Sequence, residues 1–268
     1  MKKITIIAVA CCTAFFWGCN DDSTSLKKSN SSSIEVAETN TGVYAKLTAT
    51  WCGSCGEWGW DLNEEIIEEL GNGTIAASFY GSASSKMSNE TAIRFKNDFG
   101  GKGTPSFSYN GENLTEYAES GGIYTGQSKT NIVTAAYDFN NAPVEMGVGG
   151  NVTIEGTTIT LNWAVKAFAE QTGTFKVGAY VLEDGVMEIQ SGKTGEVAHK
   201  HVLRDNMTND FYGVDFEGGL TAGTQTDLEP VTYEMNDSWN ANNIEIIGII
   251  WKSDNSGGYE FVNAARLN

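Results

Sequence analysis

The stretch "TATWCGSCGEW", residues 48–58, follows a short apolar segment and contains two cysteines, Cys52 and Cys55, in a Cys-x-x-Cys pair. Such a pair has three ordinary uses in proteins. It can be a redox-active dithiol, half of a zinc site, or a structural disulfide. The Cys-x-x-Cys spacing is compatible with all three uses, so the choice between them depends on the rest of the chain.

The composition describes a globular protein with an acidic surface. Of 268 residues, 40% are apolar and 3 are proline, so the chain can bury a hydrophobic core in one large domain or two ordinary ones. Acidic residues outnumber basic residues 34 to 17, which gives a formal net charge of −17. A surface of this sign repels phosphate backbones, so nucleic acid is not expected as a partner.

Residues 1–18 have the pattern of a signal peptide. Lys2 and Lys3 precede an apolar run that is too short to span a membrane comfortably, and the run ends at Gly18-Cys19. A small residue before a cysteine, with a polar stretch after it, resembles the bacterial lipobox, in which the cysteine is acylated. We therefore expect a lipid on Cys19 that anchors the chain to the outer membrane. A cleaved signal peptide without a lipid is the alternative.

Residues 19–42 are rich in Ser, Asn, Asp and Thr and have no apolar periodicity, so we interpret them as a flexible tether. Removal of the signal peptide takes two of the five cysteines with it, and a lipid would occupy Cys19. Cys52 and Cys55 then remain together in an oxidising compartment. A bridge between them closes a very short loop and adds little stability, which disfavours a purely structural role.

Residues 43–141 show an alternation of short strands and helices. In each expected helix, apolar residues recur at helical spacing, and a strand precedes it. The expected segments are a strand at 43–49, a helix at 55–70, a strand at 74–80, a helix at 87–100, a strand within 103–111 and a helix at 128–139 with Ser128 as its N-cap. This order indicates an α/β domain.

Several of these features together resemble the thioredoxin fold: Trp51, the Cys52–Cys55 pair at a helix start, and Thr104-Pro105 before a later strand. A cysteine at a helix N-terminus lies among free backbone N–H groups, which favour the thiolate. Cys52 should then be the exposed nucleophile and Cys55 the resolving thiol. The resemblance implies a cis Pro105, with Thr104 and Trp51 beside the extended substrate; an ordinary trans proline is the alternative.

One position departs from the thioredoxin pattern. Thioredoxins carry a buried acid six residues before the first cysteine, and this chain has Lys46 there. A lysine could favour the thiolate electrostatically, but it cannot act as the same carboxylate relay. We expect a shift of one residue along the strand that points Lys46 to solvent.

A zinc site at the dithiol would need two further ligands. The only histidines in the sequence are His199 and His201, far along the chain and in what the pattern predicts to be another domain. We interpret them as a packed or surface pair and expect neither a metal nor a cofactor.

The pattern changes to short alternating strands in residues 142–268, which indicates an all-β antiparallel sandwich after the α/β domain. A lipobox, a tether, a thioredoxin-like segment and a sandwich that contains "VLEDGV", "HKHVLRD" and "FVNAARLN" together resemble the twenty-eight-kilodalton outer membrane protein family. The resemblance implies a lipoprotein on the periplasmic or the cell-surface side of the outer membrane.

Two functions fit these observations. The first is a lipid-anchored thiol–disulfide oxidoreductase whose partners are protein thiols or disulfides of the cell envelope, attacked by Cys52 and resolved by Cys55 through a mixed disulfide. The second is a non-enzymatic surface lipoprotein in which the thioredoxin-like domain is a scaffold and the sandwich binds a protein or glycan. We favour the first, because a scaffold has no need for a dithiol at a helix start.

Overall fold

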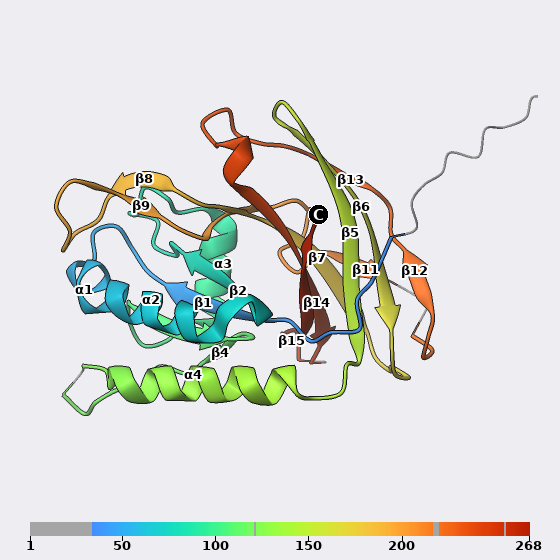
Figure 1. The fold of residues 1–268 in the computed structure, drawn as a ribbon, viewed down its shortest axis with the longest axis horizontal. Coiled ribbons are helices and arrows are strands. Elements are labelled where there is room, and N and C mark those ends of the chain that lie inside the picture. Colours follow the sequence, from blue (N-terminus) through green and yellow to red (C-terminus); the bar gives the residue numbers. More distant parts are fainter. Residues whose placement is uncertain (1–33, 121, 217–219, 255) are drawn as a thin grey trace, which may run out of the picture. The chain divides into compact units, whose positions relative to one another are not determined.

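The computed structural model describes residues 34–268 except for 121, 217–219 and 255. The expected signal peptide at 1–18, the lipid on Cys19 and the first part of the tether lie outside the described residues. Residues 34–268 form one compact unit. Figure 1 shows the elements of this unit in chain order.

A mixed β-sheet contains the strand that leads to the Cys52–Cys55 pair. β1 (Gly42–Leu47) pairs in parallel with β2 (Thr74–Phe79) and antiparallel with β3 (Ser106–Tyr109). The short strand β4 (Glu112–Asn113) pairs antiparallel with β3. Parallel neighbours need a crossover connection, and the amphipathic helix α2 (Trp58–Leu70) with a following 3-10 turn supplies it.

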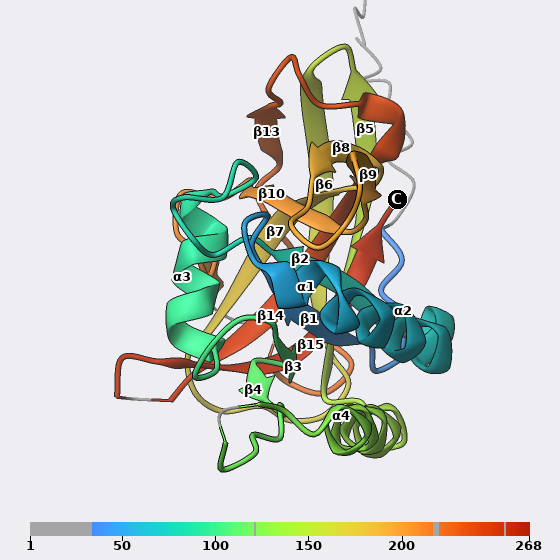
Figure 2. The same cartoon turned by 90° about the vertical axis from the view of Figure 1, so that its left-hand side faces the viewer.

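Helices cover both faces of this sheet (Figure 2). α2 and α4 (Thr125–Asn140) pack on one face, where Tyr44 of β1 meets the apolar stripes of both helices. α3 (Glu90–Phe99) packs on the other face, where Phe95 meets the alternate residues of β1. The alternation of side chains along β1 therefore decides which of its residues face α2 and which face α3.

Two helix boundaries differ from the sequence-based expectation. The helix after the dithiol is divided into α1 (Gly53–Gly56) and α2, with the break at Glu57, whose backbone is not helical. The last helix begins at Thr125, three residues before the expected start, so Ser128 is not its N-cap. The Ser128 hydroxyl instead donates at 2.9 Å to the carbonyl of Tyr124, which is the N-cap residue of this helix.

The rest of the chain is almost entirely β-structure, as expected. Its strands are β5 (Met146–Glu155), β6 (Thr158–Ala167), β7 (Phe175–Glu183), β8 (Val186–Ile189), β9 (Glu196–His199), β10 (Val202–Asn206), β11 (Val214–Phe216), β12 (Gln225–Asp227), β13 (Val231–Glu234), β14 (Ile244–Ser253) and β15 (Tyr259–Leu267). A 3-10 turn at Ala241–Asn243 precedes β14. The prediction of a mixed α/β region followed by a β region is confirmed.

The two regions share one sheet. Within residues 34–268, the order β15-β14-β7-β10-β2-β1-β3-β4 runs without interruption, and β11 joins it at β7. The junction is narrow: β10 pairs with β2 at Val202 and Ser78, and the Ser78 amide donates to the His201 carbonyl at 2.7 Å. The expected domain boundary after residue 141 falls in the loop between α4 and β5, but the sheet crosses it.

A second sheet packs against the far part of the first. It contains β12, β6 and β13, with β5 on the other side of β6. Trp163 and Leu161 of β6 lie in one buried cluster with Val177 of β7 and Ile250 of β14. The two sheets therefore enclose a common apolar core.

Residues 34–42, the second part of the expected tether, are packed against the body of the protein. The Asn40 side chain donates to the carbonyls of Phe139 and Ala142 at 3.0 and 2.8 Å, and the Asn263 side chain accepts from the Thr41 amide at 2.8 Å. Their polar composition suggested a flexible segment, but these side chains and amides have specific hydrogen-bond partners. A tether can extend no further than residue 33.

Candidate functional site

The dithiol lies where β1 ends and the helical crossover begins. Cys52 is the N-cap residue of α1, and its sulfur accepts from the Cys55 amide at 3.2 Å. Cys52 and Cys55 are joined in a disulfide, and they are only 5% and 1% exposed. Cys52 is thus the more accessible of the pair, but it is not the exposed side chain that its position predicts.

The Thr104–Pro105 peptide bond is cis, as the resemblance implied, and it lies directly against the disulfide. The Thr104 carbonyl oxygen is 3.5 Å from the Cys52 sulfur, and the Thr104 hydroxyl is 3.8 Å from the Cys55 sulfur. Gly59 of α2 permits this approach, because a Cβ at this position would lie 2.7 Å from the Pro105 ring. The fold thus assembles residues that are about fifty positions apart in sequence.

Trp51 completes the predicted group. Its side chain is 54% exposed, and the indole N–H donates to the Ser82 hydroxyl at 3.3 Å. Trp51 and Thr104 line a pocket of about 270 Å³ beside the disulfide, together with Lys96 and Lys102. All five predicted dithiol-site residues are therefore neighbours, and one side of the disulfide adjoins an open pocket.

The opposite side of the dithiol is covered by the loop of the β8–β9 hairpin, which sequence reasoning missed. In Figures 1 and 2 this hairpin lies over α1. The Gln190 amide donates to the carbonyls of Ala49 and Cys52 at 3.2 and 2.9 Å, and the Ser191 N–H donates to the Thr50 carbonyl at 2.8 Å. The loop therefore holds the turn between β1 and α1.

Glycines allow the loop to lie so close to the cysteines. A Cβ on Gly56 would be 2.0 Å from the Ser191 carbonyl oxygen, and one on Gly192 would be 2.5 Å from the Gly53 carbonyl oxygen. Gly192 also has a φ of 89°, which favours glycine. The polar, glycine-rich sequence around residues 190–195 signals a turn, but nothing in it indicates contact with a motif 138 residues earlier.

Lys46 is buried, which corrects the expectation that it faces solvent. It lies on the same face of β1 as Tyr44, toward α2, and is 4% exposed. Its ammonium group is 5.1 Å from the centre of the Trp60 ring, an attractive cation–π arrangement. Burial lowers the pKa of the Lys46 ammonium to about 8, against an opposing effect of the Glu64 carboxylate. The strand keeps its register, so the position of the thioredoxin acid is occupied here by a buried cation.

The two histidines have separate partners. His199 is 1% exposed, its Nδ1 is 2.5 Å from the Tyr80 hydroxyl, and its Nε2 is 3.2 Å from the Glu188 carbonyl. Burial lowers the pKa of the His199 imidazole. His201 lies outside β9 with a φ of 54°, and its Nδ1 is 3.2 Å from the Asp184 carboxylate. His199 is thus a packed core residue and His201 a surface residue.

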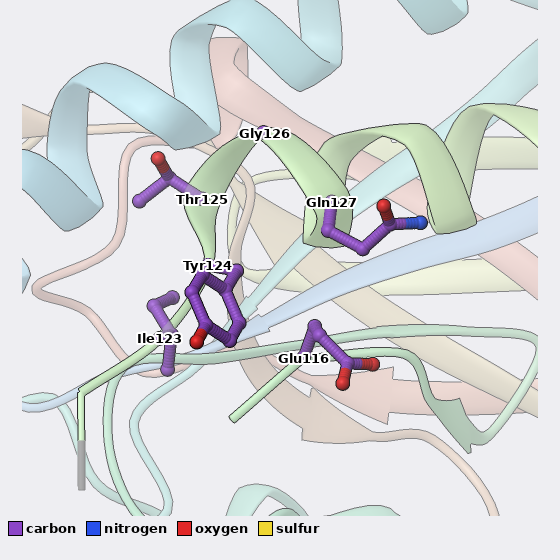
Figure 3. A pocket seen from close by; sticks show the side chains of 6 residues that line it. All are labelled: Glu116, Ile123, Tyr124, Thr125, Gly126 and Gln127. Atoms are coloured by element: carbon purple, nitrogen blue, oxygen red, sulfur yellow. The ribbon is translucent and has the colours of Figure 1, made fainter. Parts of the chain in front are cut away.

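A larger hollow, of about 780 Å³, lies at the start of α4 (Figure 3). Its lining consists of Glu116, Ile123, Tyr124, Thr125, Gly126 and Gln127. It contains none of the predicted site residues and a single charged side chain, so it gives no chemical reason to prefer it to the dithiol. Among residues 34–268, apart from the five undescribed positions, no helix is long and apolar enough to cross a membrane.

Comparison with known protein families identifies a family that this chain matches. The family described as outer membrane protein Omp28 matches residues 95–268. The matched part includes Thr104-Pro105 and the β8–β9 hairpin, but it begins after Cys52 and Cys55. A search of curated proteins found no match.

Comparison with solved structures supports a thioredoxin-like domain joined to a β domain. HBP35 of Porphyromonas gingivalis is similar with a TM-score of 0.66 at 15% identity, over 87% of this chain and 76% of that chain. At this identity the likeness shows the fold alone. CsgH of R. palustris aligns with a TM-score of 0.22 at 10% identity, over 45% of this chain and 91% of that chain. The E. coli curli protein CsgC aligns with a TM-score of 0.20 at 13% identity, over 44% of this chain and 94% of that chain. The TM-scores of CsgH and CsgC are too low to support an argument.

Proposed function

The chain belongs to the Omp28 outer membrane protein family, and we propose that it is a thiol–disulfide oxidoreductase of the cell envelope that acts through Cys52 and Cys55. The observation that carries the proposal is the position of the disulfide. It lies at a helix start, within 3.5 Å of the Thr104 carbonyl that precedes a cis proline, and beside the exposed Trp51. A purely structural disulfide has no need for these neighbours.

The chemistry is an exchange of disulfide bonds. A substrate thiolate attacks the Cys52 sulfur, the Cys52–Cys55 bond breaks, and Cys55 leaves as a thiolate. A second substrate thiolate then attacks the substrate sulfur of this mixed disulfide and releases Cys52 as a thiolate. The substrate loses two electrons and gains a disulfide, and the protein gains the two electrons as a dithiol. The reverse sequence reduces a substrate disulfide.

The same family membership supports a location at the outer membrane, and we propose that a lipid on Cys19 provides the anchor. Residues 34–42 are packed against the body, so the anchored segment between the lipid and the folded unit is short. Metabolic labelling with a fatty acid should mark the wild type and not Cys19→Ala. Labelling of both would exclude Cys19 as the acceptor, and labelling of neither would favour a cleaved signal peptide.

A second candidate is a non-enzymatic surface protein in which the two facing sheets form a β-sandwich that binds a protein or glycan. Two observations favour it: Cys52 is only 5% exposed, and the family match begins after the dithiol. This candidate requires the disulfide to be inert toward other thiols.

A trapping experiment separates the two candidates. In cells that express Cys55→Ala, an oxidoreductase should accumulate mixed disulfides between Cys52 and envelope proteins, because the resolving thiol is missing. The variant with both cysteines replaced by alanine is the control and should trap nothing. The purified mature protein should also exchange its disulfide with glutathione. Failure to exchange, together with no trapped protein, would refute the oxidoreductase and support the surface module.

A further inference from the structure

The open pocket beside the disulfide carries positive charge on an acidic protein. Among the described residues that line it, Lys96 and Lys102 are the only charged ones. In the whole chain acidic residues outnumber basic ones 34 to 17. The lining of this pocket is therefore positively charged, whereas the chain as a whole is negatively charged.

These two ammonium groups are also free of carboxylate partners in the part of the chain that the structure describes. Lys96 has an exposed side chain, and Lys102 lies with its ammonium 5.5 Å from the Tyr117 ring. Five other lysines form ion pairs within the protein: Lys86, Lys129, Lys176, Lys193 and Lys200. The charge at the pocket is thus available to a ligand.

The backbone around the pocket fixes where these charges lie. A Cβ on Gly81 would be 2.5 Å from the Lys96 Cβ. The aliphatic part of the Lys96 side chain therefore packs against the backbone of Gly81, which follows β2. A Cβ on Gly101 would be 2.0 Å from the Tyr117 hydroxyl, which also accepts from the Lys102 N–H at 3.0 Å. Both lysines are therefore attached to closely packed segments.

The pocket lies on the side of the disulfide that Thr104 contacts. The Gln190–Gly192 loop covers the opposite side through its hydrogen bonds to the carbonyls of Cys52 and Thr50. Thr104 belongs both to the pocket lining and to the contacts of the disulfide, at 3.5 Å from the Cys52 sulfur. A peptide whose cysteine meets Cys52 therefore has its neighbouring residues beside Trp51, Lys96 and Lys102.

We propose that this pocket selects protein substrates in which the reacting cysteine is flanked by acidic side chains. The inference rests on the proposed function, because it specifies the substrate class of the same site. Opposite charges in such a cleft raise the rate of encounter and hold the peptide in one orientation. Because the protein as a whole carries a charge of −17, nonspecific attraction would favour basic peptides instead. A preference for acidic peptides thus distinguishes the pocket from the rest of the surface.

The test uses the mature Cys55→Ala protein and three peptide disulfides of equal length. Each peptide carries one cysteine as a mixed disulfide with thionitrobenzoate, flanked by glutamate, glutamine or lysine. The Cys52 thiolate attacks the peptide sulfur, a Cys52–peptide disulfide forms, and thionitrobenzoate leaves as a coloured thiolate. Rates are divided by the rate of each peptide with a small free thiol, which corrects for its intrinsic reactivity.

The glutamate peptide should react on the order of tenfold faster than the lysine peptide at low ionic strength, and salt should reduce the difference. Replacing Lys96→Gln and Lys102→Gln together should bring the ratio of the glutamate-peptide rate to the lysine-peptide rate down to about one or below. Lys166→Gln with Lys252→Gln is the matched control, because these lysines lie over Phe168 and Phe175 outside the pocket. The control should retain the preference.

Two failures have different meanings. Equal rates for the three peptides, or a preference that survives the loss of Lys96 and Lys102, would overturn the inference and leave the proposed function intact. Release of thionitrobenzoate no faster than with Cys52→Ala/Cys55→Ala would refute the proposed function itself.

Discussion

The side chain of Gln190 donates a hydrogen bond of 2.9 Å to the backbone carbonyl of Cys52. Gln190 follows β8 in the C-terminal region, whereas Cys52 belongs to the thioredoxin-like region. The C-terminal region thus contributes the wall that encloses the disulfide on one side, in addition to extending the central sheet. The two regions are coupled at the site where the proposed chemistry takes place.

Removal of the Gln190 amide should loosen the turn that carries the dithiol. Gln190→Ala leaves the buried carbonyls of Ala49 and Cys52 without their donor, and we expect unfolding free energy to fall by roughly 1–3 kcal/mol. The disulfide should also be reduced faster by dithiothreitol. Gln127→Ala is the control, since its amide bonds to Asn131 on the exposed face of α4. Equal reduction rates in the two variants would contradict a covering role for Gln190.

The two glycines of the dithiol motif should respond differently to alanine. In Gly56→Ala the new methyl group would meet the Ser191 carbonyl at 2.0 Å, so the loop or α1 must shift. Crowding of this kind costs roughly 1–3 kcal/mol, to be measured by denaturant unfolding. In Gly53→Ala the nearest atom is 3.8 Å away, and the change should stay within about 0.5 kcal/mol. A similar loss for both variants would mean that the motif, rather than the contact with Ser191, resists substitution.

Local sequence patterns predicted most of the thioredoxin-like region. The helical spacing in α2 and α3, the apolar run of β2, and the Thr104-Pro105 signal before β3 each correspond to an observed element. These features depend on interactions between residues that are close in sequence, so periodicity and turn residues are sufficient to find them. The five dithiol-site residues were identified instead through the resemblance to the thioredoxin fold, which implied that the Cys52–Cys55 pair and Thr104-Pro105 lie together.

Pairings between distant strands were not predictable in this way. Within the sheet, the strands of the two regions pair at a single residue pair, Val202 with Ser78, and the cover over the disulfide depends on Gln190. The local periodicity of the sequence indicates neither contact, because both depend on how distant parts of the chain pack together. The burial of Lys46 was missed because a cation in a strand is usually solvated, and only the tertiary structure reveals the Trp60 ring beside it.

Replacement of the buried Lys46 should stabilise the protein at neutral pH. The folded-state pKa of about 8 lies below the ordinary value of 10.5, so between these values the unfolded chain binds a proton that the folded chain does not. Wild-type stability therefore rises with pH across this window, and below pH 8 the full cost of burying the charge is present. We expect Lys46→Met to gain roughly 1–3 kcal/mol at pH 7, and its advantage to shrink toward pH 10.5.

Urea unfolding of Lys46→Met and wild type from pH 7 to 10.5 measures this effect. Lys193→Met is the matched control: its ammonium lies 5.3 Å from the same Trp60 ring, but the side chain is 29% exposed. The control should show no comparable gain at pH 7. A stability difference between Lys46→Met and wild type that is constant over the whole range would rule out the buried ammonium as its cause.

The hydrogen bond between Tyr80 and His199 should contribute to the stability of the folded protein. Both side chains are 1% exposed, and Tyr80→Phe would leave Nδ1 of His199 without its partner in a site that water does not reach. An unpaired buried polar atom costs roughly 1–3 kcal/mol, so thermal and urea unfolding should both show a loss of this size. Tyr137→Phe removes a hydroxyl from a side chain that is 69% exposed, and it should change stability little. If the two variants were equally stable, the ring contacts of His199 with Tyr80 and Trp60 would have to hold the imidazole without the hydrogen bond.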